Sequence, residues 1–289
     1  MTKTIGIIGL GIMGGAMARN LIAAGWQVFG HDTDAERMAI PGLTPCRDAG
    51  DVAGRTALLL TSLPSVKAVM ATAETIAATG LPPRTVIEAS TLALEDKLRF
   101  HDILNSAGHI PLDCPISGTG SQAITKDLVI YASGNAQAIE ATRPAFAAFT
   151  RAVHDVGVFG NGTRMKLVAN LLVAIHNVAS AEAMVLGMKA GLDPKQVCDL
   201  VIAGAGTSRV FELRAPMMVT REYLPATMKV DIWQKDMHII GDFATALGVP
   251  TPTFSATLPI YAAAQAQGHG SDDTAAVCAV LENMAAMRR

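Results

Sequence analysis

The sequence predicts a doubly wound α/β domain with a parallel sheet, followed by a long connecting helix and an all-helical domain. In residues 1–161, short apolar runs alternate with Ala-rich stretches of helical length, a pattern typical of a parallel sheet covered on both faces. From residue 162 onward only helical periodicity remains. We therefore expect three parts: 1–161 as the domain that contains the sheet, 162–190 as the connecting helix and 191–289 as the helical domain.

The expected strands are short runs of apolar and β-branched residues at 4–8, 27–31, 57–61, 85–89, 110–114, 128–132 and 152–156. Helices are expected between several of them, at 13–24, 66–79 and 94–107. The long helix at 162–190 should end at Gly191, and Pro194 should open the next helix. The remaining helices are expected at 195–203, 228–247, 255–267 and 274–287, with a loop at 247–252.

Composition and charge exclude several classes of protein. The net charge is −2 and there is no run of Lys or Arg, so neither nucleic acid nor an anionic membrane surface is an expected partner. The apolar stretch at 167–186 contains polar residues and is expected to be a buried core helix, not a membrane span. The four cysteines are scattered, which favours free thiols over a metal site. We expect a soluble, cytoplasmic protein without a metal.

The first strand is followed by a glycine-rich stretch with a physical explanation. This stretch contains too many glycines for the apolar region of a signal peptide. Three of the glycines fall in the pattern G-x-G-x-x-G, between an expected strand and an expected helix. In that context the first glycine allows a tight turn, the second lets a pyrophosphate approach the backbone, and the third lets the helix pack on the strand. The residues expected to hold a dinucleotide here are Gly9, Leu10, Gly11, Ile12, Met13 and Gly14.

Asp32 supports the same interpretation, because it ends the next strand, 23 residues after Gly9. An acidic side chain at this place can accept hydrogen bonds from the ribose hydroxyls and would repel a 2′-phosphate. The next residue is Thr33 and not an arginine. We therefore predict NAD as the cofactor, with NADP less favoured.

Two further segments carry chemistry. Ser117, Gly118 and Thr119 follow an expected strand, and a turn of this kind offers a hydroxyl and backbone N–H groups to a carboxylate. Lys166 and Asn170 lie four residues apart near the start of the long helix, so they share one face of it. A lysine at the start of such an apolar helix is costly unless it reaches a cleft or a partner.

Taken together, these motifs resemble those of the β-hydroxyacid dehydrogenase family, which includes 3-hydroxyisobutyrate dehydrogenase, tartronate semialdehyde reductase and L-threonate dehydrogenase. The resemblance covers essentially the whole chain and includes a C-terminal domain like that of 6-phosphogluconate dehydrogenase. It implies that residues 113–119 bind the substrate and that residues 160–170 form the catalytic segment. The family pattern differs at Thr119, where a second glycine is usual, and at Ala169, where asparagine is common. Smaller matches are Leu63-Pro64, Ser90-Thr91 and Lys235-Asp236, so Leu63, Pro64, Thr91 and Lys235 are further candidates for contact with the cofactor.

The resemblance implies reversible hydride transfer between NAD and the carbinol carbon of a small 3-hydroxy acid. Lys166 would act as general acid and base, with Asn170 holding it or the substrate in line and Ser117 anchoring the carboxylate. A lysine at its usual pKa of about 10.4 is a poor base at neutral pH, so burial or a cationic neighbour, for which Arg164 and Lys235 are candidates, should favour its neutral form.

Other interpretations stay open at this point. An imine reductase shares the architecture but commonly lacks the lysine, and a dinucleotide-binding sensor would need no catalytic group. A decarboxylating sugar-acid dehydrogenase would have a larger helical domain. Arg209 could reach a substrate carboxylate or form a surface ion pair, His176 is expected in the core, and His31 is expected near the adenine. The apolar helical half predicts a homodimer or a homotetramer.

Overall fold

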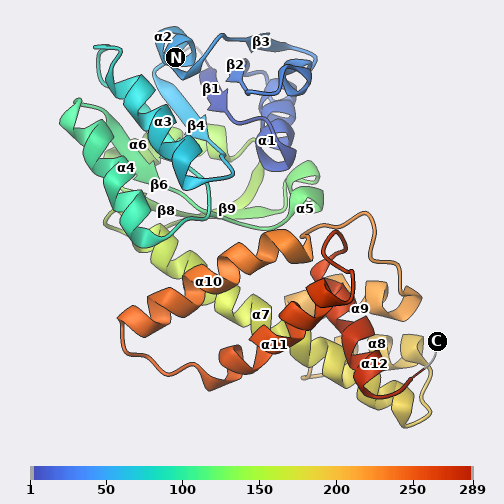
Figure 1. Cartoon of the computed structure of the whole chain (residues 1–289). Helices are drawn as coiled ribbons and strands as arrows, with labels where there is room; N and C mark the ends of the chain where they lie inside the picture. Colours follow the sequence, from blue (N-terminus) through green and yellow to red (C-terminus); the bar gives the residue numbers. More distant parts are fainter. Residues whose placement is uncertain (1–2, 288–289) are drawn as a thin grey trace. The chain divides into compact units, whose positions relative to one another are not determined.

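The structure is a computed structural model that describes residues 3–287. The chain divides into two compact units between Lys166 and Leu167. We call the first of them the sheet unit and the second the helical unit (Figure 1). The predicted fold class, a doubly wound α/β domain followed by a helical one, is confirmed.

The described part of the sheet unit contains nine strands in the order β3-β2-β1-β4-β5-β6-β8-β7, with β9 paired to β8. Their bounds are β1 (Thr4–Ile8), β2 (Gln27–His31), β3 (Leu43–Pro45), β4 (Leu58–Thr61), β5 (Thr85–Glu88), β6 (Ile110–Asp113), β7 (Ile116–Ser117), β8 (Leu128–Gly134) and β9 (Thr150–Asp155). The order reverses between β1 and β4, which is the place where an open α/β sheet binds ligands beyond the carboxyl ends of its strands.

The predicted parallel sheet extends from β3 to β6, and beyond β6 the sheet is mixed. β8 runs antiparallel to both β6 and β7, while β9 runs parallel to β8. Only the short strand β7 and the five-residue helix α5 (Gly120–Ile124) separate β6 from β8. A segment of this kind returns the chain as a hairpin and does not carry it across the sheet as a long helix would.

Alternate side chains of the strands enter two separate cores, one on each face of the sheet. Ile7, Leu60 and Ile87 pack with α1 (Ile12–Ala23), α5 and α6 (Ala136–Phe146). Ile8, Leu59 and Val86 pack with the helices of the other face, which are α2 (Ala49–Arg55), α3 (Val66–Ala77) and α4 (Leu94–Ser106). α3 and α4 lie side by side in Figure 1. This alternation is the two-residue period of a strand covered on both sides.

Several elements were not predicted, namely β3, β7, α2, α5, α6 and α9 (Arg209–Thr220). Both α6 and α9 contain an internal proline, Pro144 and Pro216, which is a helix-breaking signal in a sequence. Packing overrides that signal, because α6 buries Ile139 and Phe146 and α9 buries Phe211 and Met218. The other missed elements are too short to show a hydrophobic period.

The helical unit contains the greater part of α7 (Asn161–Lys189), a helix that continues from the sheet unit. It is followed by α8 (Pro194–Ala203), α9, α10 (Val230–Ala246), α11 (Pro252–Ala266), the 3₁₀ helix η2 (Thr274–Ala276) and α12 (Val277–Met284). By length and composition alone α7 could cross a membrane. However, Ala174, Ala181 and Met184 are fully buried in the core of the helical unit, and Asn177 donates hydrogen bonds to Tyr261 Oη and to the Thr274 carbonyl, both at 2.9 Å. These contacts are those of a helix packed in a protein core.

Candidate functional site

The glycine turn between β1 and α1 has a geometry that requires its glycines. Gly9 has φ +90°, and a Cβ on Gly14 would overlap the carbonyl oxygen of Gly9. By contrast, a Cβ on Gly11 would meet only Arg37 Nη1, at 3.7 Å, so the space beside it is open. Gly11 is the N-cap of α1 and provides no side-chain acceptor for the first helical N–H groups. An open backbone surface at a helix N-terminus fits the pyrophosphate of a dinucleotide.

Asp32 lies directly after β2 and is held against this turn. Its Oδ2 accepts a hydrogen bond from Leu10 N at 2.7 Å, and its Oδ1 accepts one from Asp34 N at 2.9 Å. Arg37 Nη1 lies 3.7 Å from Asp32 Oδ2. Arg37 was missed by the sequence analysis, because it lies five residues beyond Asp32 and is brought back by the 3₁₀ helix η1 (Ala35–Met38).

The loops after β4 and β5 are joined by one hydrogen bond. Leu63 N donates to Ser90 Oγ at 2.9 Å, so the predicted segments Leu63-Pro64 and Ser90-Thr91 lie together. Ser62 N in turn donates to Ile8 O, at the end of β1. The segments predicted to contact a cofactor in the sheet unit therefore meet at the carboxyl ends of neighbouring parallel strands.

The segment Ser117-Gly118-Thr119 links β7 to α5. Gly118 has φ +139°, which explains why a glycine stands there. Thr119 is the N-cap of α5, and its backbone N–H donates to Gln122 Oε1 at 3.1 Å. A Cβ on Gly120 would lie 2.5 Å from Ile12 Cγ2, so this turn packs closely on the first residue of α1. The predicted substrate segment and the glycine turn are thus neighbours.

Lys166 and Asn170 both lie on α7 with little exposure, 8% and 4% respectively. The helix begins at Asn161, and Thr163, two residues later, is fixed to Asp113 by two hydrogen bonds. In the helical unit Asn170 Nδ2 donates to Asp236 Oδ2 at 3.0 Å. Asp236 therefore orients the amide of Asn170.

The other charged candidates are more exposed. Arg164 Nη1 donates to Asn161 Oδ1 at 2.9 Å, on the outside of the first turn of α7. Lys235 Nζ lies 3.7 Å from Asp236 Oδ1, with its side chain about half exposed. Arg209 pairs with Glu212 at 2.9 Å, the surface ion pair that its position allowed. His31 Nδ1 lies 3.1 Å from the Cys46 carbonyl oxygen.

The sequence analysis missed a group of buried charges, one of which, Asp113, it had placed in the predicted substrate-binding segment 113–119. Lys97, Glu88 and Asp113 are fully buried, and Lys97 forms ion pairs with both carboxylates. A signal was present in the sequence, because Lys97 shares the apolar face of α4 with Phe100 and Leu104, at i, i+3 and i+7. A lysine at such a position needs a buried partner.

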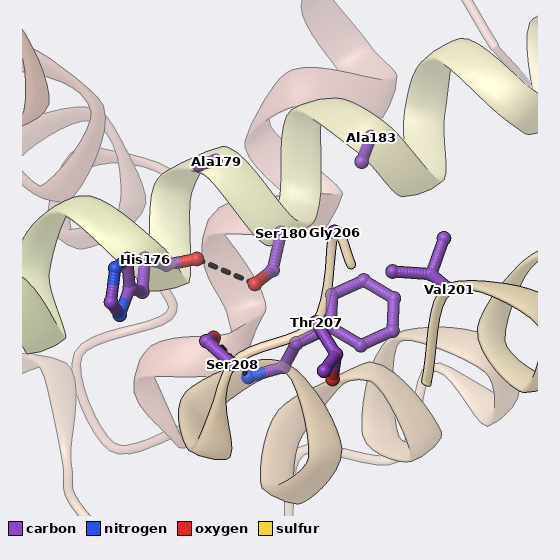
Figure 2. A pocket seen from close by; sticks show the side chains of 9 residues that line it. His176, Ala179, Ser180, Ala183, Val201, Gly206, Thr207 and Ser208 are labelled. Atoms are coloured by element: carbon purple, nitrogen blue, oxygen red, sulfur yellow. Dashed lines mark hydrogen bonds between the residues drawn. The ribbon is translucent and has the colours of Figure 1, made fainter. Parts of the chain in front are cut away.

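A pocket in the helical unit lies elsewhere and contains none of the predicted site residues (Figure 2). Its lining comes from α7, the loop after α8 and the start of α9: His176, Ala179, Ser180, Ala183, Val201, Gly206, Thr207, Ser208 and Phe211. His176 is partly buried at its edge. Ser180 Oγ donates to the His176 carbonyl within α7, and Ser208 Oγ accepts from Phe211 N as the N-cap of α9. Both hydroxyls therefore already form hydrogen bonds with the backbone of their own helices.

Comparison with known proteins gives whole-chain matches. Residues 4–158 match the model for the NAD binding domain of 6-phosphogluconate dehydrogenase. Residues 160–281 match that for the NAD-binding region of NADP-dependent 3-hydroxyisobutyrate dehydrogenase. L-threonate dehydrogenase of Cupriavidus necator is 32% identical, with 97% of each chain covered.

Solved structures of dehydrogenases and reductases also match this chain over most of its length. The 3-hydroxyisobutyrate dehydrogenase of Mycobacterium tuberculosis, solved with L-serine, has a TM-score of 0.88 at 27% identity, over 97% of this chain and 99% of that one. An imine reductase from a Pseudomonas species has a TM-score of 0.58 at 19% identity, over 97% of this chain and 100% of that one. At that level of identity the second likeness concerns the fold alone.

Proposed function

Because the chain belongs to the β-hydroxyacid dehydrogenase family, as its motifs predicted, we propose that it transfers a hydride reversibly between NAD and a small 3-hydroxy acid. Membership of the family makes the protein an NAD(P)-dependent hydroxyacid dehydrogenase. The observation that carries the specific proposal is the place of Lys166. It is a nearly buried lysine, one turn after the point where α7 is fixed to the sheet.

The residues around the glycine turn fit a bound dinucleotide. Gly9, Leu10, Gly11, Ile12, Met13 and Gly14 would hold the pyrophosphate, and Asp32 would accept hydrogen bonds from the adenosine ribose. Leu63, Pro64, Thr91 and Lys235 would contact the remainder of the cofactor. When bound, the nicotinamide supplies the hydride chemistry, and the protein binds and orients.

We propose NAD as the preferred cofactor, because the carboxylate of Asp32 disfavours a 2′-phosphate. Arg37 supports a weaker second candidate, NADP. Its guanidinium lies 3.7 Å from Asp32 and on the open side of Gly11, where it could pair with a phosphate. The balance between these two side chains sets the preference.

The substrate end of the site would be built from two segments. Ser117 Oγ and the backbone of Gly118 and Thr119 would bind the substrate carboxylate. Lys166 Nζ would accept the hydroxyl proton during oxidation and return it during reduction, and Asn170 would hold the reacting group in line. Asp236 keeps Asn170 oriented for this task.

The substrate class follows from what the relatives are named for and from one departure in this chain. The related enzymes act on L-threonate, on L-serine and on 3-hydroxyisobutyrate, all of which carry a hydroxyl on C3. Thr119, in place of the usual glycine, adds a hydroxyl to the carboxylate-binding turn. We therefore favour a hydroxylated 3-hydroxy acid over an apolar one.

The test is the initial rate of NADH formation over a panel of L-threonate, L-serine and 3-hydroxyisobutyrate. Each acid is run with the wild type, Lys166→Ala and the control Lys195→Ala. Lys195 is exposed and forms a surface ion pair with Asp199 of its own helix, so its loss should change little. Loss of the acid–base group should lower kcat about 10²-fold or more. A rate that Lys166→Ala leaves intact would contradict the mechanism.

The two alternatives give different results in the same experiment. A sensor would bind NADH tightly and show no rate with any acid. An imine reductase would show no rate with the acids but would oxidise NADPH when a cyclic imine is added. Lys166, Asn170 and Ser117 together favour the dehydrogenase, since neither alternative requires all three.

We further propose a cytoplasmic homodimer or homotetramer. Val168, Leu172 and Leu186 are exposed apolar side chains of α7, at spacings of four and fourteen residues, so they lie along one face of the helix. Such a face is buried in a closed symmetric assembly. Light scattering after gel filtration measures the assembly, and a monomer at micromolar concentration would contradict it.

A further inference from the structure

The ion pairs of Lys97 form the most deeply buried charged cluster in the sheet unit. Lys97 Nζ contacts Glu88 Oε2 and lies 3.1 Å from Asp113 Oδ1, and no part of the three side chains is exposed. Burial by itself would lower the pKa of Lys97, but Glu88 and Asp113 raise it above its usual value. The two carboxylates within ion-pair distance thus favour the charged form of Lys97.

One carboxylate of the cluster reaches the loops at the cofactor side. Glu88 Oε1 accepts a hydrogen bond from Ser90 N at 2.9 Å. Ser90 Oγ accepts one from Leu63 N, also at 2.9 Å. Glu88 thus fixes the turn after β5, and this turn fixes the loop after β4.

The other carboxylate reaches the start of α7. Asp113 Oδ2 accepts from Thr163 N at 2.7 Å, and Asp113 Oδ1 accepts from Thr163 Oγ1 at 2.9 Å. Ser133 Oγ, 3.3 Å from Asp113 Oδ2, accepts from Gly162 N at 2.9 Å. A carboxylate at the N-terminus of a long helix is also stabilised by the helix dipole. Asp113 therefore fixes the turn that precedes Lys166.

We propose that Lys97, Glu88 and Asp113 form a positioning unit that holds Lys166 in register with the Ser90–Thr91 turn, an inference that rests on the proposed role of Lys166 as acid and base. Apolar side chains of similar size would stabilise a core as well as a buried ion cluster does. Apolar side chains could not accept hydrogen bonds from the backbone N–H groups of Ser90 and Thr163, as Glu88 and Asp113 do. The hydrogen bonds of the two carboxylates lead to these segments, which together carry the predicted cofactor and catalytic residues.

Thr163 provides the sharpest test, because its side chain can be changed without removing a charge. Thr163→Val keeps the shape and the backbone hydrogen bond but loses the bond from Oγ1 to Asp113, whereas Thr163→Ser keeps that hydroxyl. We expect Thr163→Val to lower kcat about 10-fold or more, since small misplacements of a catalytic group are costly. The Kd for NADH should stay within twofold of wild type, and Thr163→Ser should restore most of kcat.

Two outcomes of that comparison would overturn the proposal. One is a folded Thr163→Val protein with the kcat of wild type. The other is a Thr163→Ser protein as slow as Thr163→Val, since the methyl group and not the hydrogen bond would then matter. Lys97→Met extends the test. If Lys97 acts through Asp113 and Thr163, the double variant Lys97→Met/Thr163→Val should lose no more than the more impaired single variant. If Lys97→Met does not fold, the Thr163 pair still decides.

A second readout separates this proposal from the proposed function. The pH dependence of acetylation of the Lys166 amine by acetic anhydride, followed by peptide mass spectrometry, needs no substrate. Thr163→Val should shift the Lys166 profile and leave that of Lys195 in the same sample unchanged. If no acid gives a rate with the wild type, the proposed function fails. The acetylation profiles of Lys166 then decide by themselves whether the cluster positions Lys166. A shift restricted to Lys166 supports positioning, and unchanged profiles refute it.

Discussion

Replacing Asp273 by asparagine should destabilise the helical unit by about 3–5 kcal/mol at pH 7. Asp273 is fully buried and accepts hydrogen bonds from two sides. Its Oδ2 accepts from Thr227 N at 2.8 Å, Thr227 Oγ1 at 2.6 Å and Met228 N at 3.1 Å. Its Oδ1 accepts from Ala275 N at 3.0 Å and Arg214 Nε at 3.3 Å.

The magnitude follows from what a carboxamide cannot do. Only one of its two positions accepts hydrogen bonds, so the better orientation keeps the oxygen at the Oδ2 side and turns the NH₂ toward Ala275 N and Arg214. One buried backbone N–H without an acceptor costs about 1–3 kcal/mol. Loss of the carboxylate also leaves the buried Arg214 guanidinium without this charged partner, although its Nε keeps a hydrogen bond to Thr274 Oγ1 at 2.9 Å. Removing one partner of a buried ion pair costs about 3–5 kcal/mol. The same substitution causes both losses and the two costs overlap, so the expected destabilisation is about 3–5 kcal/mol and not the sum of the two figures.

The sign of the pH dependence can be stated. Burial alone would raise the pKa of Asp273, but Arg214 and the hydrogen bonds from Thr227, Ala275 and Met228 lower it below its usual value. A lowered pKa in the folded state means that the stabilisation is present above the unfolded pKa of about 3.9. It is lost as the pH falls through the folded pKa. The difference between wild type and Asp273→Asn should therefore shrink below about pH 4.

Urea unfolding measured by tryptophan fluorescence is a suitable assay. In a Trp26→Phe background, Trp233 reports on the helical unit, where it is buried. At a typical slope near 2 kcal/mol per M urea, the midpoint should fall by roughly 2 M. The control Asp199→Asn removes an exposed partner of Lys195 and should cost at most about 1 kcal/mol. A loss below about 1 kcal/mol for Asp273→Asn at pH 7, or a difference that does not shrink in acid, would refute the reasoning.

Three further changes have defined outcomes. Gly14→Ala should raise the Kd for NADH at least about 10-fold in a fluorescence titration, because its Cβ would overlap the Gly9 carbonyl and open the turn. The control Gly54→Ala lies on an open face of α2, so it should leave NADH binding unchanged and add about 0.5–1 kcal/mol of stability. Equal binding by both variants would contradict the role of the turn. Arg37→Ala should lower kcat/KM for NADP more than for NAD, and the opposite order would show that Arg37 does not meet a 2′-phosphate. Tyr261→Phe should cost about 1 kcal/mol in urea unfolding through the lost bond from Asn177. Burial raises the pKa of Tyr261 to about 12, so ultraviolet absorbance should show a tyrosine ionisation in strong alkali that the Phe variant lacks; identical alkaline titrations of the two proteins would contradict the burial of Tyr261.

Much of the fold could be predicted because its signals are local. The expected strand at 4–8 is β1, and the one at 27–31 is β2. Those at 57–61, 85–89 and 110–114 match β4, β5 and β6 to within one residue at each end. These strands are buried on both faces and appear as continuous apolar runs. α6 and α9 were missed because each contains an internal proline, and the packing that stabilises them despite it is not visible in the sequence.

Parts of the candidate site could likewise be predicted from the sequence, and other parts could not. The glycine turn is visible in the sequence because a backbone shape limits the residues that can adopt it, and the clash at Gly14 shows this limit directly. The roles of Lys166, Asn170 and Ser117 came from a resemblance to a family, and they remain predictions. Arg37 was not predictable, since its approach to Asp32 depends on how η1 returns the chain.

The sequence by itself determined the doubly wound sheet, the helical second half, the glycine turn and the family, because each depends on residues that are close in the chain or on motifs in a fixed order. Only the tertiary structure decided which residues support them. Glu88, Lys97, Asp113 and Thr163 lie on four different elements, and no pattern along the chain records that their side chains meet. Ion pairs and hydrogen bonds act over about 3–4 Å in space, whatever the separation in sequence, so only the folded chain brings such a cluster together.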